Sequence, residues 1–442
     1  MLKRILTDPR KSFLALGLVK LLLLSGSCAR IFPDSSSYYS LNVFDLSQWP
    51  NATRTPGYPA IFSIASLLPG GDSLDFQIHF AIALQFLISW VAAWVFGKIV
   101  HQFTGSDKLR LVAMWVYGTS YVIFSWETFV LTESLALSGV VFYIGLLAAF
   151  LKAPKARYAV AIFALLLLLT FIRPTFLMYF PITLVFFFCY AVLHKKWKAL
   201  FQACACCLVF FLPLHFYMSA YEEKFGVYTT SRLLARQTAV IIAHTGMLED
   251  PAPSQKELAD IMKEGLTYDP NRDESDISYA RAAEAKLEQV ADLPRINEFN
   301  REMILHDPLG FLFGRVVAAL DALKLPYSYP PEPNFSLAGA PGVLLTAIAM
   351  VPSYLINFSC VVCFGIGAFI YFMFKWIRKK EFDLVWAGIW CCILVPCATA
   401  IFATYAEFPR TSLAALPFFF LGVFLALQKI VSWIRAGHLV TV

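Results

Sequence analysis

The feature that most constrains this chain is a succession of apolar runs separated by short polar links. Windows of roughly 19 residues identify membrane spans, and about 20 apolar residues in a helix cross a bilayer. Because backbone polar groups find no water in lipid, spanning segments are helices or closed barrels. We therefore predict an all-α polytopic membrane protein with about ten transmembrane helices. Their expected positions are 12–32, 76–97, 109–126, 129–150, 157–172, 175–193, 199–218, 341–374, 384–404 and 411–434.

The composition agrees with a membrane protein. Of the 442 residues, 59% are hydrophobic and only 15% are charged, which exceeds the apolar share of soluble domains. The formal net charge of +6 needs no nucleic-acid partner, because Lys and Arg accumulate in the cytoplasmic loops of membrane proteins. The ten cysteines lie in apolar runs, where cysteine behaves as a small packing residue. The expected surroundings are membrane lipids.

The distribution of Lys and Arg assigns an orientation. If the N-terminus is cytoplasmic, the basic clusters such as 3–11, 195–198 and 375–380 all fall on the cytoplasmic side. Lys20 and the absence of a clear cleavage site indicate that the first run is retained rather than removed as a signal peptide. Both termini are then cytoplasmic. The short links on the other side contain the following basic residues: Arg30, Arg54, Arg173 and Arg410.

A polar stretch separates the first two apolar runs. It contains DSSSYY at 34–39 and RTPGYP at 54–59. Pro56 presets φ for the first central position of a turn, and Gly57 supplies the positive φ that a type II turn needs next. The pattern predicts a sharp reversal, which fixes one carboxylate and one guanidinium near a membrane surface. This arrangement suits chemistry on a lipid-borne phosphate.

Two of the outer arginines, Arg173 and Arg410, lie beside prolines at the ends of spans. Each could simply extend its charge to lipid headgroups. The alternative is that several arginines converge on an anionic ligand, because a guanidinium binds phosphate through a planar fork. Both interpretations stay open. Arg54 and Arg173 are the better candidates for binding phosphate, and Arg410 is held in reserve.

Glu133 opens the fourth apolar run, directly after Thr132. A carboxylate at this depth is costly without a partner. It either compensates the dipole at a helix N-terminus or lines an outward cavity, where it holds an arginine or a metal ion. The sequence leaves the two roles open. Tyr38 and Tyr58 of the polar stretch are expected at the same cavity.

The composition changes after Ser219, where charges of both signs replace the long apolar runs as far as residue 306. We predict a small extracytoplasmic helical domain here. Arg232 and Arg236 are four residues apart and share a helix face, so both are candidate contacts for a phosphate or headgroup. The acidic residues at 269–276 lack the glycine and terminal glutamate of an EF-hand and are interpreted as a solvated loop.

The chain accordingly divides into three parts. An N-terminal transmembrane module covers 1–218 and includes the outer loop 33–75 with the candidate chemistry. The extracytoplasmic domain and a following amphipathic and proline-rich loop cover 219–333, and a C-terminal transmembrane module covers 334–442.

Taken together, these residues resemble the membrane-embedded glycosyltransferases of the GT-C type that use polyprenyl-phosphate sugars, such as protein O-mannosyltransferases and aminoarabinose transferases. The match covers residues 1–180 in order and the end of the chain weakly. It is carried by Asp34 with Tyr38, the RTPGYP element, Thr132 with Glu133, Arg173 with Pro174, and Arg410.

The resemblance implies a GT-C-like bundle in the plasma membrane of a bacterium, with an extracytoplasmic active site. It implies a polyprenyl-phosphate-linked sugar donor and a glycan, lipid or protein acceptor. Asp34 would be the general base, and the arginines would bind the donor phosphate. Many relatives have a second acid where this chain has Ser35. No metal ligand is therefore assigned, and the sequence leaves open whether a divalent metal ion takes part.

Physical chemistry supports these roles. An acceptor hydroxyl must lose its proton as it attacks the anomeric carbon, and a placed carboxylate typically contributes ~10²–10⁴-fold. Arginines stabilise the charge on the leaving phosphate, and a single displacement inverts the anomeric centre. The competing hypothesis is a transporter or flippase of lipid-linked sugars, which needs no base. Transporters carry such residues near mid-membrane, whereas these polar residues gather at outer span ends, which favours an enzyme.

Overall fold

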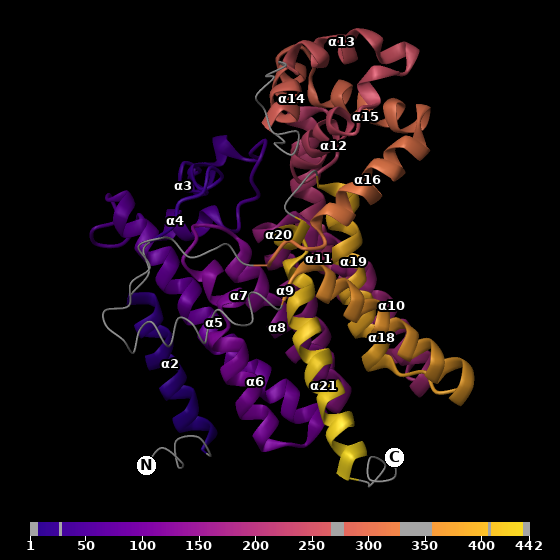
Figure 1. Ribbon diagram of the computed structural model, residues 1–442. Coiled ribbons are helices and arrows are strands. Elements are labelled where there is room, and N and C mark those ends of the chain that lie inside the picture. Colours follow the sequence, from indigo (N-terminus) through magenta and orange to yellow (C-terminus); the bar gives the residue numbers. More distant parts are fainter. Residues whose placement is uncertain (1–7, 26–28, 267–277, 328–355, 405–407, 436–442) are drawn as a thin grey trace.

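The computed structural model describes residues 8–25, 29–266, 278–327, 356–404 and 408–435, and these ranges contain helices and no strand. Long helices run side by side and form a bundle (Figure 1). The bundle consists of α2 (Pro9–Ser25), α5 (Leu74–Thr104), α6 (Asp107–Thr119), α8 (Glu133–Lys152), α9 (Ala156–Ile172), α10 (Tyr179–His194), α11 (Trp197–Phe225), α18 (Phe358–Lys379), α19 (Leu384–Ala403) and α21 (Leu416–Arg435).

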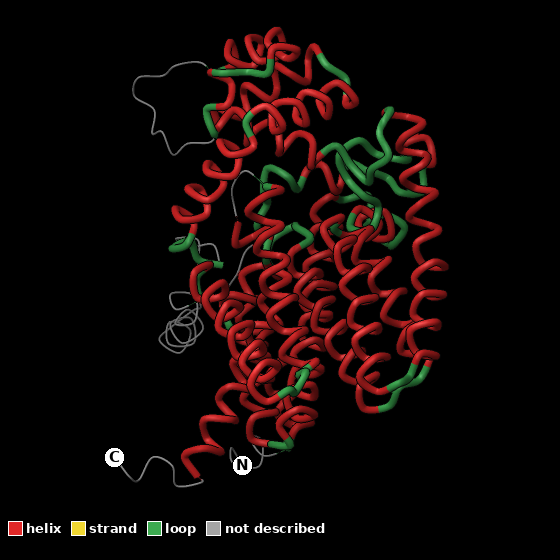
Figure 2. Tube along the Cα trace, turned by 90° about the vertical axis from the view of Figure 1, so that its right-hand side faces the viewer, coloured by secondary structure: helices red, strands yellow, loops and turns green. Residues whose placement is uncertain are grey.

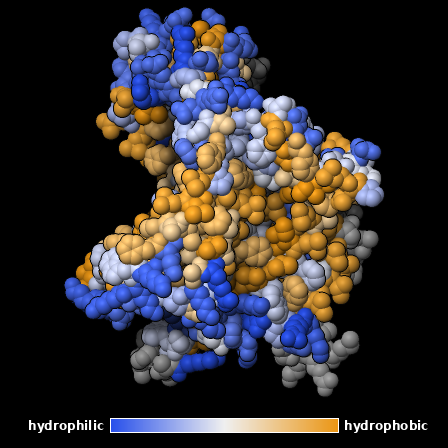
Figure 3. Space-filling model, turned by 180° about the vertical axis from the view of Figure 1, so that it is seen from behind, coloured by the Kyte–Doolittle hydropathy of each residue, from blue (hydrophilic) through white to orange (hydrophobic). Residues whose placement is uncertain are grey.

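The described helices fit a membrane. Seven are long and apolar enough to cross one, or eight if the bent pair α15 (Leu293–His306) and α16 (Pro308–Ala322) forms one span. On the face seen in Figure 3, apolar residues form a band between two hydrophilic ends. The predicted all-α polytopic membrane protein is thus confirmed. The beginning of α2 and the end of α21 lie at the same end of the bundle (Figure 1).

The third predicted span, 109–126, is interrupted. α6 ends at Thr119, and Ser120 leaves the helical conformation with ψ of 126°. The chain continues as the short α7 (Tyr121–Phe124) and the 3₁₀ helix η2 (Ser125–Glu127). The break turns Glu127 into the interior, where its buried carboxylate meets a lysine from another helix.

Two predicted boundaries also differ from the structure. α11 continues past residue 218 as far as Phe225, where Gly226 adopts the left-handed conformation with φ of 76° that commonly ends a helix. The span predicted at 341–374 corresponds to α18, which begins at Phe358. Its earlier part, the proposed boundary at 333–334 and the acidic stretch 269–276 lie outside the described residues.

The first outer loop lies at the end of the bundle opposite the chain termini, beside the helical domain (Figures 1 and 2). It contains α3 (Ser36–Tyr39), η1 (Leu46–Gln48) and α4 (Pro59–Ala65). Pro59 at the first position of α4 is favourable, because that position needs no backbone N–H donor.

The prediction of a type II turn with positive φ at Gly57 is wrong. The described glycines with positive φ are Gly70, Gly105, Gly226 and Gly246. Gly57 is instead required by a close approach of two backbones. Its N–H donates to the carbonyl of Phe171 at 2.8 Å, and a Cβ added to Gly57 would lie 2.6 Å from the Phe171 carbonyl carbon. The loop is thereby held against the end of α9, two residues before Arg173.

The helical domain after α11 contains α12 (Leu233–His244), α13 (Lys256–Gly265), α14 (Ser278–Val290) and α15. Its own core includes Leu258, Met262, Leu287 and Phe299, all buried. The end of α11 and the segment that leads into the domain both contact the Ala52 carbonyl of the first outer loop. The Tyr221 hydroxyl donates to the Ala52 carbonyl at 2.7 Å, and the Arg232 backbone N–H donates to the same oxygen at 3.0 Å.

Candidate functional site

Two carboxylates and three arginines from distant parts of the chain meet at the outer end of the bundle. Asp34 Oδ1 lies 3.1 Å from Arg54 Nη2, and Asp34 Oδ2 lies 3.1 Å from Arg410 Nη2. Arg410 Nε also lies 2.6 Å from Glu133 Oε1. Arg173 Nη1 approaches the same Glu133 oxygen at 3.3 Å. We call these five residues the outer cluster.

Asp34 is held by backbone contacts with the segment that precedes α8. The Arg30 N–H donates to the Thr128 carbonyl at 2.8 Å, and the Val130 N–H donates to the Arg30 carbonyl at 3.0 Å. The Ser35 hydroxyl donates to the Val130 carbonyl at 2.9 Å. The carboxylate of Asp34 is therefore placed by its neighbours on both sides in sequence.

The Asp34 side chain is accessible and charged. It is 42% exposed, whereas the Arg54 and Arg410 side chains are 13% and 11% exposed. Partial burial raises the pKa of Asp34, but the charges and hydrogen bonds of the two arginines outweigh this effect and lower that pKa below its ordinary value. Asp34 is thus ionised at neutral pH and can accept a proton from a solvent-side ligand.

Arg54 is fixed by three contacts in addition to its ion pair with Asp34. Its Nε donates to the Ser37 hydroxyl at 2.6 Å, and its Nη1 donates to the Tyr38 hydroxyl at 3.1 Å. Its guanidinium carbon also lies 4.4 Å from the centre of the Tyr38 ring, which is a favourable cation–π arrangement. Tyr38 was expected at the cavity, and the structure places its hydroxyl against the cluster.

Glu133 is the first residue of α8, and its side chain is 1% exposed. The preceding Thr132 makes no side-chain hydrogen bond to the helix N-terminus. Glu133 instead contacts the guanidinium groups of Arg410 and Arg173. Of the two roles that the sequence left open, the geometry corresponds to a carboxylate that holds arginines.

Arg173 and Arg410 are adjacent as well as paired with the same carboxylate. Arg173 Nη2 donates to the Arg410 carbonyl at 3.2 Å. Arg410 lies in α20 (Phe408–Thr411), and its guanidinium carbon is 4.9 Å from the Phe32 ring centre. The buried Nη1 of Arg173 has no hydrogen-bond partner, although it lies within ion-pair distance of Glu133.

Tyr58 does not line a cavity, contrary to the prediction. Its side chain is fully buried, and its hydroxyl donates to Gln85 Oε1 at 3.0 Å. The physical reason is that α4 packs on α5, which turns the Tyr58 ring toward the bundle interior.

Arg232 and Arg236 are occupied within the helical domain. Arg236 forms a two-pronged contact with Glu284, at 2.5 and 3.0 Å. Both arginines also approach Glu288, Arg236 at 3.2 Å and Arg232 at 3.4 Å. Their positive charge is thus balanced by carboxylates of α14. The expectation that they are available to a headgroup is not met in this arrangement.

Sequence reasoning missed a buried ion pair between α2 and η2. Lys20 Nζ lies 2.6 Å from Glu127 Oε1, and both side chains are 0% exposed. The Ser89 hydroxyl donates to the same Glu127 oxygen at 2.5 Å. The available signal was a lysine inside an apolar run, which is rare without a partner. Gln85 on α5 gave no such signal.

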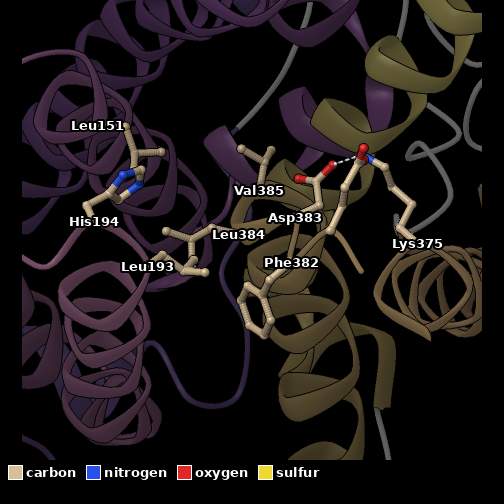
Figure 4. A pocket seen from close by; sticks show the side chains of 9 residues that line it. Leu151, Leu193, His194, Lys375, Phe382, Asp383, Leu384 and Val385 are labelled. Carbon is tan, nitrogen blue, oxygen red and sulfur yellow. Dashed lines mark hydrogen bonds and ion pairs between the residues drawn. The ribbon is translucent and has the colours of Figure 1, made fainter. Parts of the chain in front are cut away.

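A separate pocket of about 470 Å³ lies between the end of α8, the end of α10 and the link from α18 to α19 (Figure 4). Leu151, His194, Lys375 and Asp383 are among its lining residues, and Lys375 Nζ pairs with Asp383 Oδ2 at 3.0 Å. Leu151 lies 18 residues after Glu133 in α8, or roughly 27 Å along a helix axis. The pocket is therefore distinct from the outer cluster. Among the described residues, no group of three or more His, Cys, Asp or Glu side chains could hold a metal ion.

No protein-family model matches the sequence, and neither does any curated protein. Solved structures do match. Oligosaccharyltransferase AglB from Archaeoglobus fulgidus, in complex with an inhibitory peptide and a dolichol-phosphate, is similar with a TM-score of 0.50 and 14% identity, over 97% of this chain and 50% of that one. The chain has a GT-C-like fold. The GT-C-like fold that the resemblance implied is thus confirmed.

A second structure of the Archaeoglobus fulgidus oligosaccharyltransferase, tethered to an acceptor peptide that contains the NVT sequon, gives a TM-score of 0.49 at 14% identity. It covers 96% of this chain and 50% of that chain. The present chain therefore spans about half the length of the solved structures that it matches.

Proposed function

We propose that this protein is a GT-C type glycosyltransferase. It transfers a sugar from a polyprenyl-phosphate donor to an acceptor hydroxyl on the extracytoplasmic side of a bacterial inner membrane, with inversion. The observation that carries the proposal is the contact of the exposed carboxylate of Asp34 with both Arg54 and Arg410. A proton acceptor and a set of phosphate ligands thereby occur in one place, within a fold similar to that of an oligosaccharyltransferase.

Asp34 acts as the general base. The acceptor oxygen attacks the anomeric carbon, its proton passes to an Asp34 oxygen, and the bond from that carbon to the phosphate oxygen breaks. The products are the glycosylated acceptor and the polyprenyl phosphate. A placed carboxylate typically contributes ~10²–10⁴-fold to such a step. The 42% exposure of the Asp34 side chain leaves room for an acceptor.

The arginines bind the donor phosphate and stabilise the charge that develops on it. Guanidinium groups fixed in advance do this better than water, because they need no reorganisation during the reaction. Arg54 and Arg410 also hold the Asp34 carboxylate. A bound phosphate therefore competes with Asp34 for these two arginines, which makes Asp34 a stronger base at the moment when the donor is in place.

The surroundings of the cluster suit a lipid-linked donor. The apolar band of Figure 3 offers a lipid-like surface to the polyprenyl chain, and the AglB structure contains a dolichol-phosphate. The helical domain lies at the same end as the cluster (Figure 1), and we propose that it shapes the acceptor side. The orientation with both termini in the cytoplasm follows from the basic residues of the links on that side.

The test is turnover by the purified full-length protein in lipid nanodiscs. A panel of undecaprenyl-phosphate sugars is supplied with candidate glycan, lipid A and peptide acceptors, identified beforehand by mass spectrometry of envelope glycoconjugates from cells that lack the protein. The expected result is release of undecaprenyl phosphate together with a glycosylated acceptor. Translocation of a labelled donor across proteoliposomes without transfer would contradict the proposal and identify a flippase instead.

A further inference from the structure

We infer that Gln85 is a positioning residue that sets the distance between Arg54 and the two carboxylates of the outer cluster. This inference rests on the proposed function. Gln85 lies in α5 with a side chain that is 0% exposed. Its Nε2 donates to the carbonyls of Glu127 at 3.1 Å and Phe129 at 2.9 Å. Its Oε1 accepts from the Tyr58 hydroxyl at 3.0 Å. Both N–H donors and the oxygen of the amide are thus used.

One side of this bridge leads to Arg54. Tyr58 follows Arg54 by four residues in the RTPGYP element. Its ring meets the Tyr38 ring edge to face, with centroids 4.9 Å apart. The Tyr38 hydroxyl accepts a hydrogen bond from Arg54. The position of Tyr58 therefore determines where the phosphate-binding guanidinium lies.

The other side leads to both carboxylates of the cluster. Phe129, whose carbonyl Gln85 holds, pairs with Arg30 as an isolated β-bridge. The next carbonyl, that of Val130, accepts from the Ser35 hydroxyl beside Asp34. Four residues after Phe129 the chain begins α8 at Glu133. A single amide on a long helix therefore contacts both segments that carry the proposed chemistry.

The buried ion pair reinforces the same bridge. Ser89 lies one helical turn after Gln85 on α5 and shares its face. It donates to Glu127, which also pairs with Lys20 of α2. Removal of one charge would leave the other buried without a partner, which is strongly destabilising. Gln85 is uncharged, so it is the better residue at which to separate positioning from folding.

The experiment compares Gln85→Leu with a matched control, Tyr143→Phe. Leucine has a similar size but makes none of the three hydrogen bonds. Tyr143 on α8 shares a buried hydrogen bond of 2.8 Å with Thr183, away from the bridge. Turnover is normalised to the folded fraction, which gel filtration and thermal unfolding measure. Gln85→Leu is expected to lower kcat about 100-fold, the effect of a displacement near 1 Å. Tyr143→Phe is expected to lower kcat less than about 3-fold.

Tyr58→Phe tests the link from a second side. This variant removes only the hydroxyl that donates a hydrogen bond to Gln85 Oε1. Its kcat should therefore fall less than that of Gln85→Leu. The double variant should be no slower than Gln85→Leu alone, because both changes break the same connection. A kcat of Gln85→Leu within about 3-fold of wild type, or multiplicative losses in the double variant, would overturn the inference.

Amide hydrogen exchange provides a second measurement, which needs no substrate. Amides in 30–38 and 54–59 are expected to exchange faster in Gln85→Leu than in Tyr143→Phe. Unchanged exchange in both segments would refute the positioning role. If the wild-type protein transfers no sugar, the proposed function fails by itself, and the exchange measurement still decides whether Gln85 positions these segments.

Discussion

At the scale of single residues, Asp34 is governed by two opposing effects. Burial favours its neutral form, whereas Arg54 and Arg410 favour the carboxylate and prevail. The carboxylate is therefore charged at neutral pH in the free protein but a weak proton acceptor. In the proposed mechanism, a donor phosphate that engages the same arginines raises the pKa of Asp34 only when the donor is bound. Proton removal would then be restricted to protein molecules that already hold a donor.

A change at Arg54 tests this balance. In Arg54→Gln, one of the two charges that lower the pKa of Asp34 is gone, so that pKa should rise. The acidic limb of the pH profile of kcat/KM, which reports groups of the free enzyme, should then move to higher pH. Arg281→Gln in the helical domain is a suitable control, because it leaves the charges around Asp34 unchanged. An acidic limb that stays in place in Arg54→Gln would show that Asp34 is not the titrating base.

At the scale of elements, the sequence predicts most helices but not how their ends are joined. Apolar runs locate the spans because only apolar helices are stable in lipid. The outer arginines are recognised because most other Lys and Arg residues of the short links lie on the opposite side. The contacts of Gln85 and the pairing of Lys20 with Glu127 were missed, since only packing brings these residues together. Tyr58 was misassigned for the same reason: a tyrosine in a polar turn looks exposed until α4 packs on α5.

The contact between the first outer loop and α9 depends on Gly57. In Gly57→Ala, the new Cβ would lie 2.6 Å from backbone atoms of Phe171, which cannot move aside as a flexible side chain can. The loop with Arg54 must therefore shift away from Arg173. We expect turnover to fall about 100-fold, the effect of a displacement near 1 Å, with a raised KM for the donor. Gly367→Ala in α18, where a Cβ meets nothing within 4 Å, controls for the loss of a glycine, and equal kinetics of the two variants would contradict the account.

The buried ion pair between α2 and η2 can be tested through the stability of the protein. Glu127→Gln leaves the Lys20 charge without a counterion in the interior and should destabilise the protein by about 3–5 kcal/mol. The double variant Lys20→Met with Glu127→Gln removes both charges and should recover most of that loss. Thermal unfolding in one detergent measures all three proteins. A double variant as unstable as Glu127→Gln would mean that the charges are not the cause.

At the scale of the whole molecule, two hydrophilic ends flank an apolar band, and the candidate chemistry lies at only one of them. The first outer loop, the helical domain and the ends of α9 and α19 meet at that end (Figure 1). The end of α11 and the segment that leads into the domain contact the loop at the Ala52 carbonyl. The basic residues of 195–198 and 375–380 lie at the opposite ends of their helices. The molecule thus has basic residues at one end of the bundle and the outer cluster at the opposite end.

Labelling tests this orientation. In a background without native cysteines, Leu46→Cys in the exposed part of the first outer loop should react with a membrane-impermeant maleimide added outside intact spheroplasts. Lys379→Cys at the end of α18 should react only after the membrane is opened. Both side chains are exposed in the structure, so accessibility does not limit either reaction. The reverse pattern would place the outer cluster in the cytoplasm.

The most direct test of the central claim is single-turnover transfer by Asp34→Asn. Asparagine keeps the size and the polarity of Asp34 but cannot take up a proton. The account predicts an unchanged thermal midpoint, donor affinity at least equal to that of wild type because Arg54 and Arg410 lose a competing carboxylate, and transfer reduced at least ~10²-fold. If Asp34→Asn retained most of the wild-type transfer rate, Asp34 would not be the base and the outer cluster would not be the site of this chemistry.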